Sequence, residues 1–245
     1  MNNPQNPQTL ARVTGWLFVV TFVASIPAYF ILYAPVRDDP GLITGAGADP
    51  TASVALGAVL ELITIVANVG TAVVLFPILR RQNEAGAIGY VGARLVECTF
   101  IAIGIISLLT FLFMRQEGSA DAALGEAFVA IYDRAFLVGP GIFAGVANGL
   151  VLGYLMFRSE LVPRGMAMLG LIGGPLIVLS GIAIMFDLTE RGGTLQGIAT
   201  IPEFFWELSL GIYLIVKGFR SSSPILAMDG TVGIPESPSA ERKGV

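Results

Sequence analysis

The stretch Val13–Ala34, VTGWLFVVTFVASIPAYFILYA, contains no charged side chain in 22 consecutive positions. A helix needs about 20 mainly apolar residues to cross the hydrocarbon core of a membrane. The apolar core of a secretory signal is shorter, about 7–15 residues, and a small-residue cleavage site follows it. No clear site of that kind follows Ala34. We therefore expect a retained membrane-spanning helix.

Five further stretches are long and apolar enough to span a membrane. Ala135–Phe157 and Gly165–Phe186 carry no charge, and the other three contain embedded charges. The sequence thus predicts an all-α integral membrane protein, a six-helix transmembrane bundle over residues 13–220. The expected spans cover about 13–34, 54–79, 88–114, 135–157, 165–186 and 197–216.

The composition agrees with this class and excludes several others. Hydrophobic residues make up 54% of the chain, charged residues 13%, and the mean hydropathy is +0.77; soluble domains carry about 25% charged residues. With no histidine, catalytic triads and haem or zinc sites that need histidine are excluded. The single cysteine, Cys98, excludes an intrachain disulfide and iron–sulfur clusters. We expect no nucleic-acid partner, no metal and no cofactor.

Positive charges in the connecting segments predict the orientation. Cytoplasmic loops of membrane proteins carry an excess of Lys and Arg. Here nine such residues fall on one side and four on the other, which places both termini in the cytoplasm, with a tail over 1–12 and a disordered tail over 221–245. The nine are Arg12, Arg80, Arg81, Arg158, Arg164, Lys217, Arg220, Arg242 and Lys243; the four are Arg37, Arg115, Arg134 and Arg191.

Two features concern the fourth span. Ser119–Arg134 has a helical apolar stripe, so it is either an interfacial helix or an outward extension of that span. Glycines recur within the span at every fourth position and share one helix face, where another backbone can approach closely. We expect this face to pack within the chain, with a homo-oligomer seam as the alternative. The glycines are Gly141, Gly145, Gly149 and Gly153.

Five ionisable residues lie inside the predicted spans. Such residues are costly in a membrane and mark functional sites by default. Arg94 and Glu97 are three positions apart, and Glu203 and Glu207 four apart, so each pair shares a helix face. Glu97 and Glu207 fall ~13 and ~15 Å from the span ends, near the middle of the membrane. The third polar face, on the second span, consists of Glu61 and Asn68.

The simplest packing of the helices turns these three polar faces inward, where they form one polar cluster. In this cluster we expect Arg94 to pair with Glu97, Glu207 or both. Four carboxylates then face one arginine. Because unpaired buried carboxylates are unstable, we expect some to be protonated, neutralised by Arg134 or Lys217, or exposed to a water-filled cavity. The spans contain no nucleophile or metal cluster to accompany the glutamates, so we leave catalysis open and do not favour it.

Three groups of residues resemble a known family. They are LFPILRRQNE at 75–84 with GARLVE at 92–97, GYLMFRSELVPR at 153–164, and PEFFWE at 202–207 with LIVKGFR at 214–220. Together they resemble the bacterial integral membrane family called domain of unknown function 4386. The resemblance implies a multi-pass inner-membrane protein in which Arg94, Glu97 and Glu207 are family features, and it implies no activity.

Two functions follow from these predictions. The cluster could bind or pass a small solute, cation or proton. Alternatively, the protein is a structural or interaction protein whose buried ion pairs only fix the helix packing. A water-accessible cavity that reaches the glutamates favours the first, and a dry, closed interior favours the second.

Overall fold

A computed structural model describes residues 6–118 and 120–227 of the chain. Within these ranges the regular structure is helical and contains no strand. Six helical segments are long and apolar enough to cross a membrane, which confirms the predicted bundle. They are Pro7–Leu32, Thr51–Leu79, Glu84–Glu117, Ala122–Ser159, Arg164–Met185 and Thr194–Val216.

The first and fourth spans contain more than one helical element, because short π-helical segments interrupt them. Segment 28–32 directly follows Pro27, and segment 137–143 contains Pro140. Proline has no backbone N–H, so each of these residues removes one hydrogen bond from the regular α-helical pattern. The elements are α1 Pro7–Pro27, η1 Ala28–Leu32, α2 Ala34–Asp38, η2 Pro40–Thr44, α3 Thr51–Leu79, α4 Glu84–Glu117, α5 Ala122–Phe136, η3 Leu137–Phe143, η4 Gly145–Leu152, α6 Gly153–Ser159, α7 Arg164–Met185, α8 Thr194–Val216 and α9 Pro224–Ala227.

Both ends of the predicted domain extend further than expected. Helix α1 begins at Pro7, inside the expected tail, because the Asn6 side chain accepts a hydrogen bond from the Gln8 N–H at 2.9 Å and caps the helix. At the other end, residues 224–227 form α9, with Ser223 and Ile225 buried against the bundle. The rest of the expected disordered tail, residues 228–245, lies outside the described residues.

The fourth span is one continuous helical rod. The Asp121 side chain caps α5 by accepting a hydrogen bond from the Leu124 N–H at 2.9 Å. Helix α5 then runs directly into η3, η4 and α6. Of the two alternatives for residues 119–134, the structure therefore shows the outward extension.

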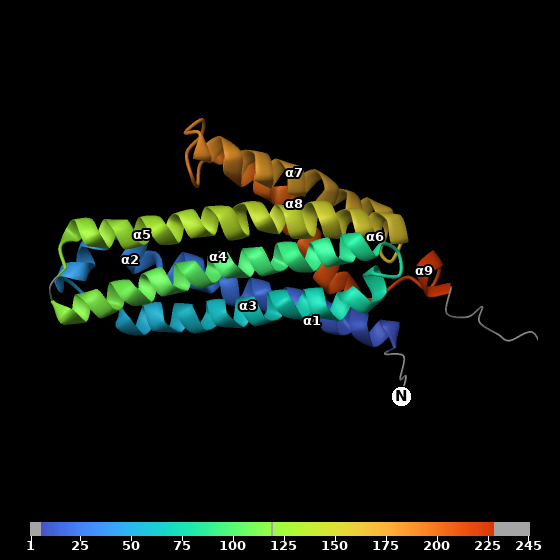
Figure 1. The fold of residues 1–245 in the computed structure, drawn as a ribbon, viewed down its shortest axis with the longest axis horizontal. Helices are drawn as coiled ribbons and strands as arrows, with labels where there is room; N and C mark the ends of the chain where they lie inside the picture. The colour runs from blue at the N-terminus through green and yellow to red at the C-terminus, as the bar shows by residue number, and fades with distance from the viewer. Residues whose placement is uncertain (1–5, 119, 228–245) are drawn as a thin grey trace, which may run out of the picture.

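The helices run side by side, and the described ends of the chain meet at the same end of the bundle (Figure 1). The Gln8 side chain donates to the Phe219 carbonyl at 2.8 Å and accepts from the Phe219 N–H at 3.0 Å. The turn between α6 and α7 contacts the described C-terminal segment, since the Arg220 N–H donates to the Leu161 carbonyl at 2.9 Å. We call this end, which also carries the Arg80–Arg81 turn, the Arg-rich end, and the opposite end the acidic end.

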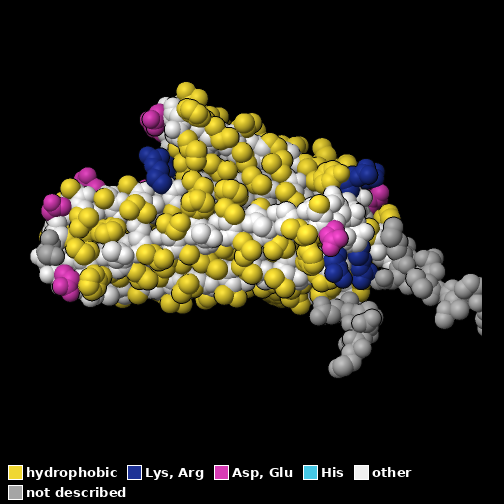
Figure 2. Space-filling view, viewed as in Figure 1, with side chains coloured by type: hydrophobic (Ala, Val, Ile, Leu, Met, Phe, Trp, Pro, Cys, Tyr) yellow, Lys and Arg dark blue, Asp and Glu magenta, His cyan; other side chains and the backbone are white. Residues whose placement is uncertain are grey.

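The outer surface matches a lipid environment. Figure 2 shows hydrophobic side chains along the lengths of the helices, with charged side chains mainly near the helix ends. Large apolar residues on five spans stay more than half exposed, among them Val23, Val66, Ile106, Leu179 and Ile198. Such a surface is unfavourable in water but matches hydrocarbon.

The glycine face of the fourth span packs against α7. A Cβ on Gly149 would lie 2.3 Å from the Gly174 Cα, and one on Gly145 would lie 2.3 Å from the Ile177 side chain. A Cβ on Gly153 would lie 3.3 Å from the Leu171 backbone nitrogen of the same helix. A helix of the same chain thus packs on this face at three of its four glycines. Gly141 is buried but contacts only its own helix.

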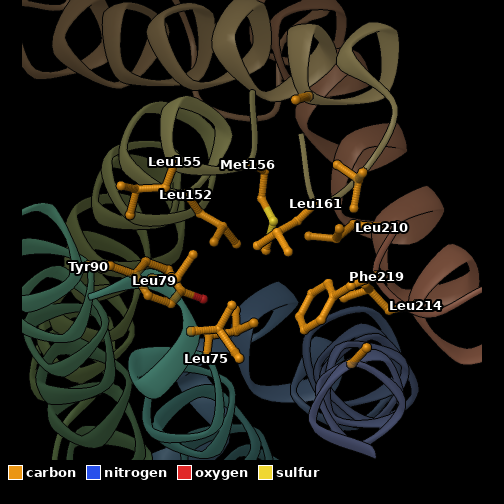
Figure 3. Close-up of a cluster of buried hydrophobic side chains, with 14 of the residues drawn as sticks. Leu75, Leu79, Tyr90, Leu152, Leu155, Met156, Leu161, Leu210, Leu214 and Phe219 are labelled. Atoms are coloured by element: carbon orange, nitrogen blue, oxygen red, sulfur yellow. The ribbon is translucent and has the colours of Figure 1, made fainter. Parts of the chain in front are cut away.

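A cluster of buried apolar side chains fills the interior at the Arg-rich end (Figure 3). Figure 3 shows these side chains pointing toward one another from the surrounding helices. We call this cluster the apolar plug. Its central members are Leu75, Leu79, Tyr90, Leu152, Leu155, Met156, Leu161, Leu210, Leu214 and Phe219.

Candidate functional site

The centre of the polar cluster joins α3 to α4. Arg94 donates from Nη1 to Oε2 of Glu97 at 2.7 Å and from Nη2 to Oδ1 of Asn68 at 2.5 Å. The Asn68 Nδ2 in turn donates to Oε1 of Glu97 at 3.1 Å. These three buried side chains therefore form a closed ring of hydrogen bonds, in which the arginine charge balances one carboxylate.

A second polar group joins the fourth span to α8. Asn148 donates from Nδ2 to Oε1 of Glu207 at 2.6 Å, and its own Oδ1 accepts from the Tyr90 hydroxyl at 3.3 Å. The Trp206 Nε1 donates to the Asn148 backbone carbonyl at 2.9 Å. The same carbonyl also accepts a hydrogen bond from the Gly153 N–H at the end of η4, so it has two donors. Glu207 is thus held by an amide, and its carboxyl group has no ion pair among the described residues.

Glu61 forms a third group nearer the acidic end. The hydroxyls of Tyr33 and Tyr132 donate to its two carboxyl oxygens at 3.1 and 3.2 Å. The two rings pack edge to face, with centroids 5.2 Å apart. This carboxyl group is satisfied by two neutral donors that come from the segment after η1 and from α5.

Glu203 differs from the other three glutamates. Only 3% of its surface is exposed, yet neither carboxyl oxygen has a hydrogen-bond partner among the described residues. Two glycines make room for it: a Cβ on Gly149 would lie 2.6 Å, and one on Gly173 2.8 Å, from the Glu203 Oε2. A buried carboxyl group without a donor is unfavourable unless it binds a proton or a cation.

All five intramembrane ionisable residues line one cavity of about 210 Å³. Five aromatic side chains share its wall, so carboxyl groups and ring faces surround the same space. The aromatic residues are Phe22, Tyr29, Phe30, Phe136 and Phe204.

The cavity has an apolar rim on one side. Ile26, Phe30 and Phe204 line it while 41%, 68% and 38% of their respective surfaces stay exposed. This part of the cavity wall therefore belongs to the apolar outer surface of the bundle.

Toward the acidic end, an ion-pair group lies beside Tyr29 of the cavity wall. Asp133 of α5 pairs with Arg37 at 3.3 Å and with Arg191, which precedes α8. Both arginines also donate to the Tyr29 hydroxyl, at 2.7 and 3.2 Å. In Figure 1, α7 and α8 lean away from α4 and α5 toward this end. The Arg191 contacts therefore tie the α7–α8 connection to the rest of the bundle.

The structure brings together all six residues expected in the polar cluster, since each lines the cavity. Arg94 pairs with Glu97, whereas Glu207 is bonded to Asn148. Arg134 and Lys217 are exposed and form no ion pair with these glutamates in the described part of the chain. Sequence reasoning missed the tyrosines that satisfy Glu61, because nothing in a single sequence links tyrosines 28 and 71 positions away.

The described ranges contain no group of three or more His, Cys, Asp and Glu that could hold a metal ion. The six apolar helices and the enclosed Arg/Glu cluster define a multi-pass integral membrane protein.

A family model described as domain of unknown function (DUF4386) matches residues 13–218, and the chain belongs to this family. The match confirms the resemblance found in the sequence. Neither the curated proteins nor the solved structures include a match to the chain.

Proposed function

We propose that this protein binds, and passes across the membrane, a small solute, cation or proton through the cavity lined by Arg94, Glu97, Glu203 and Glu207. The observation that carries the proposal is Glu203, a buried carboxyl group that faces a cavity without a hydrogen-bond donor from the described residues. Four carboxyl groups and one guanidinium leave the cavity short of positive charge. A bound proton or cation supplies the positive charge that the side chains of the cavity lack.

The apolar plug supports a gated pathway rather than an open channel. Its residues seal the interior between the cavity and the Arg-rich end. Passage to that end would require α8 to move relative to α3 and α6, because all three contribute side chains to the plug. The proposed cycle therefore alternates between access from the acidic side and access from the Arg-rich side.

The proposed orientation places the Arg-rich end in the cytoplasm and the protein in a bacterial inner membrane. The excess of Lys and Arg in the connecting segments at that end supports it. Cations would then enter the cavity from the outside.

A second candidate is a structural or interaction protein in which the ion pairs only fix helix packing. The hydrogen-bonded ring of Arg94, Glu97 and Asn68 favours it, since these side chains satisfy one another at every polar atom that joins them and leave only the Arg94 Nε without a partner among the described residues. Glu203 favours transport, because a group that only fixes packing would be expected to have a partner.

Flux measurements on the purified protein in liposomes separate the two candidates. We would impose gradients of protons, Na⁺ or K⁺ and compare the unmodified protein with Glu97→Gln and Glu207→Gln. The transport proposal predicts a flux above that of protein-free liposomes, lowered about tenfold or more by either substitution. Glu126→Gln makes the same change on the exposed side of α5 and should leave the flux unchanged.

If the Glu97 and Glu207 variants changed only the thermal stability and no gradient produced a protein-dependent flux, transport of these ions would be rejected. The structural alternative would then be preferred.

A further inference from the structure

We infer that the cavity binds a protonated organic amine that carries one apolar group about the size of a single ring. This inference rests on the proposed function and names the class of its solute. Four observations carry it: the donor-free carboxyl group of Glu203, the aromatic wall, the volume of the cavity and its apolar rim.

The charged end of the ligand follows from Glu203. Both of its oxygens are buried acceptors without a donor in the described part of the chain. An ammonium group has a positive charge and up to three N–H donors, so it can satisfy both oxygens at once. The other three glutamates already accept hydrogen bonds from Arg94, Asn148, Tyr33 or Tyr132. The ammonium nitrogen is therefore assigned to Glu203.

The aromatic wall favours an organic cation over a metal ion. Phe22 and Phe204 pack edge to face with centroids 5.3 Å apart, and Phe204 directly follows Glu203 on α8. Aromatic faces attract ammonium groups and contact apolar groups, but they replace none of the oxygen ligands that Na⁺ or Ca²⁺ needs. Among the residues that the structure describes, no cluster of metal ligands is found.

The volume sets the size of the apolar part. A cavity of about 150 Å³ accommodates one benzene molecule. The present cavity, at about 210 Å³, has room for one ring and a short aminomethyl group. Its rim of Ile26, Phe30 and Phe204 is exposed and apolar, so it can contact the ring of such an amine.

The test measures equilibrium binding to the full-length protein in lipid nanodiscs at neutral pH, where alkylamines are protonated. Benzylamine supplies charge, N–H donors and ring. Benzyl alcohol keeps the shape without the charge, ammonium and Na⁺ keep charge without the ring, and benzyltrimethylammonium keeps charge and ring without N–H donors. We expect benzylamine to bind about tenfold or more tightly than each of the others.

Substitution then locates the site. Glu203→Gln removes the charge with little change in volume and should lower benzylamine affinity about tenfold or more. Glu126→Gln is the matched control, and its affinity should equal that of the unmodified protein. The ligand comparison needs no substitution, so it remains decisive even if the Glu203 variant does not fold.

Equal affinity for benzylamine and benzyl alcohol would overturn the inference, as would unchanged benzylamine affinity in a folded Glu203→Gln protein. If no amine bound while a proton or Na⁺ flux still depended on Glu97 and Glu207, the inference would fail and the proposed function would stand. Absence of both binding and flux would reject both.

Discussion

The two halves of the bundle interior have opposite chemistry. At the Arg-rich end, the ten central residues of the apolar plug are each at most 2% exposed, and the Tyr90 hydroxyl is their only polar side-chain group. Toward the acidic end, the polar cavity is lined by the five charged residues that fall inside the expected spans, Glu61, Arg94, Glu97, Glu203 and Glu207. The interior is therefore closed and apolar at one end and polar and hollow at the other.

Single helices produce this difference along their length. On α8, Glu203 and Glu207 line the cavity, and Leu210 and Leu214 follow in the plug. On α3, Asn68 lines the cavity and Leu75 the plug. Since residues three, four and seven apart share a face, each inward face changes from polar to apolar about halfway along. The position of this change in each span therefore determines where the cavity lies.

The largest expected effect comes from breaking the polar ring. Arg94→Met removes the guanidinium and leaves Glu97 and Asn68 buried without their donor. We expect unfolding to require about 3–5 kcal/mol less, measured by denaturation in detergent micelles. The double variant Arg94→Met/Glu97→Met removes both charges and should recover part of the loss. A single variant as stable as the unmodified protein would show that the ring does not hold α3 and α4 together.

The plug should respond to a loss of volume. Leu152→Ala opens a space among side chains with no exposed surface, so we expect a loss of about 2–5 kcal/mol in the free energy of unfolding. Leu176→Ala on α7, where 39% of the residue is exposed, is the matched control and should cost clearly less. Equal effects at the two positions would contradict a tightly packed plug.

Close backbone contact beside the cavity gives a smaller effect. A Cβ at Gly149 would clash with the Gly174 backbone and crowd Glu203, so Gly149→Ala should destabilise the protein by about 1–3 kcal/mol. Gly165→Ala meets no atom within 4 Å of the added Cβ and should be neutral or slightly stabilising. Thermal unfolding of both variants checks this contrast, and similar melting temperatures would argue against it.

The smallest effect on stability is expected at the ion pairs that Asp133 forms with Arg37 and Arg191. Asp133→Asn weakens the contacts with Arg37 and Arg191, whose side chains are 20% and 18% exposed, so the cost should be about 1 kcal/mol or less. The difference from the unmodified protein should shrink as salt is raised. A loss that is large and independent of salt would mean that this group is part of the packed core.

The fold could be predicted from the sequence because a helix that crosses a membrane must contain about 20 mainly apolar residues. The apolar centre of each span could be located, but all six helical segments begin before the expected residue, because turns such as Pro7–Arg12 extend a helix beyond its apolar run. The Ser119–Arg134 ambiguity could not be settled, since an amphipathic stripe is compatible with either arrangement.

The members of the cluster could be predicted because helical spacing places Arg94 with Glu97 and Glu203 with Glu207. Their partners could not, since contacts such as Asn148 with Glu207 depend on how separate helices pack. The unsatisfied state of Glu203 depends on the close approach of Gly149 and Gly173, which spacing alone does not reveal.

The central claim, a cavity accessible to water beside a closed plug, can be tested by cysteine labelling in intact membranes. After Cys98→Ala removes the native thiol, cysteines are introduced at Ser25 in the cavity wall and at Leu79 in the plug, with Ala46 as an exposed control. We predict that a small charged thiol reagent labels the cysteines at 46 and 25 and leaves the one at 79 unmodified. Labelling at 79 comparable to that at 25, or no labelling at 25 while 46 reacts, would contradict the account.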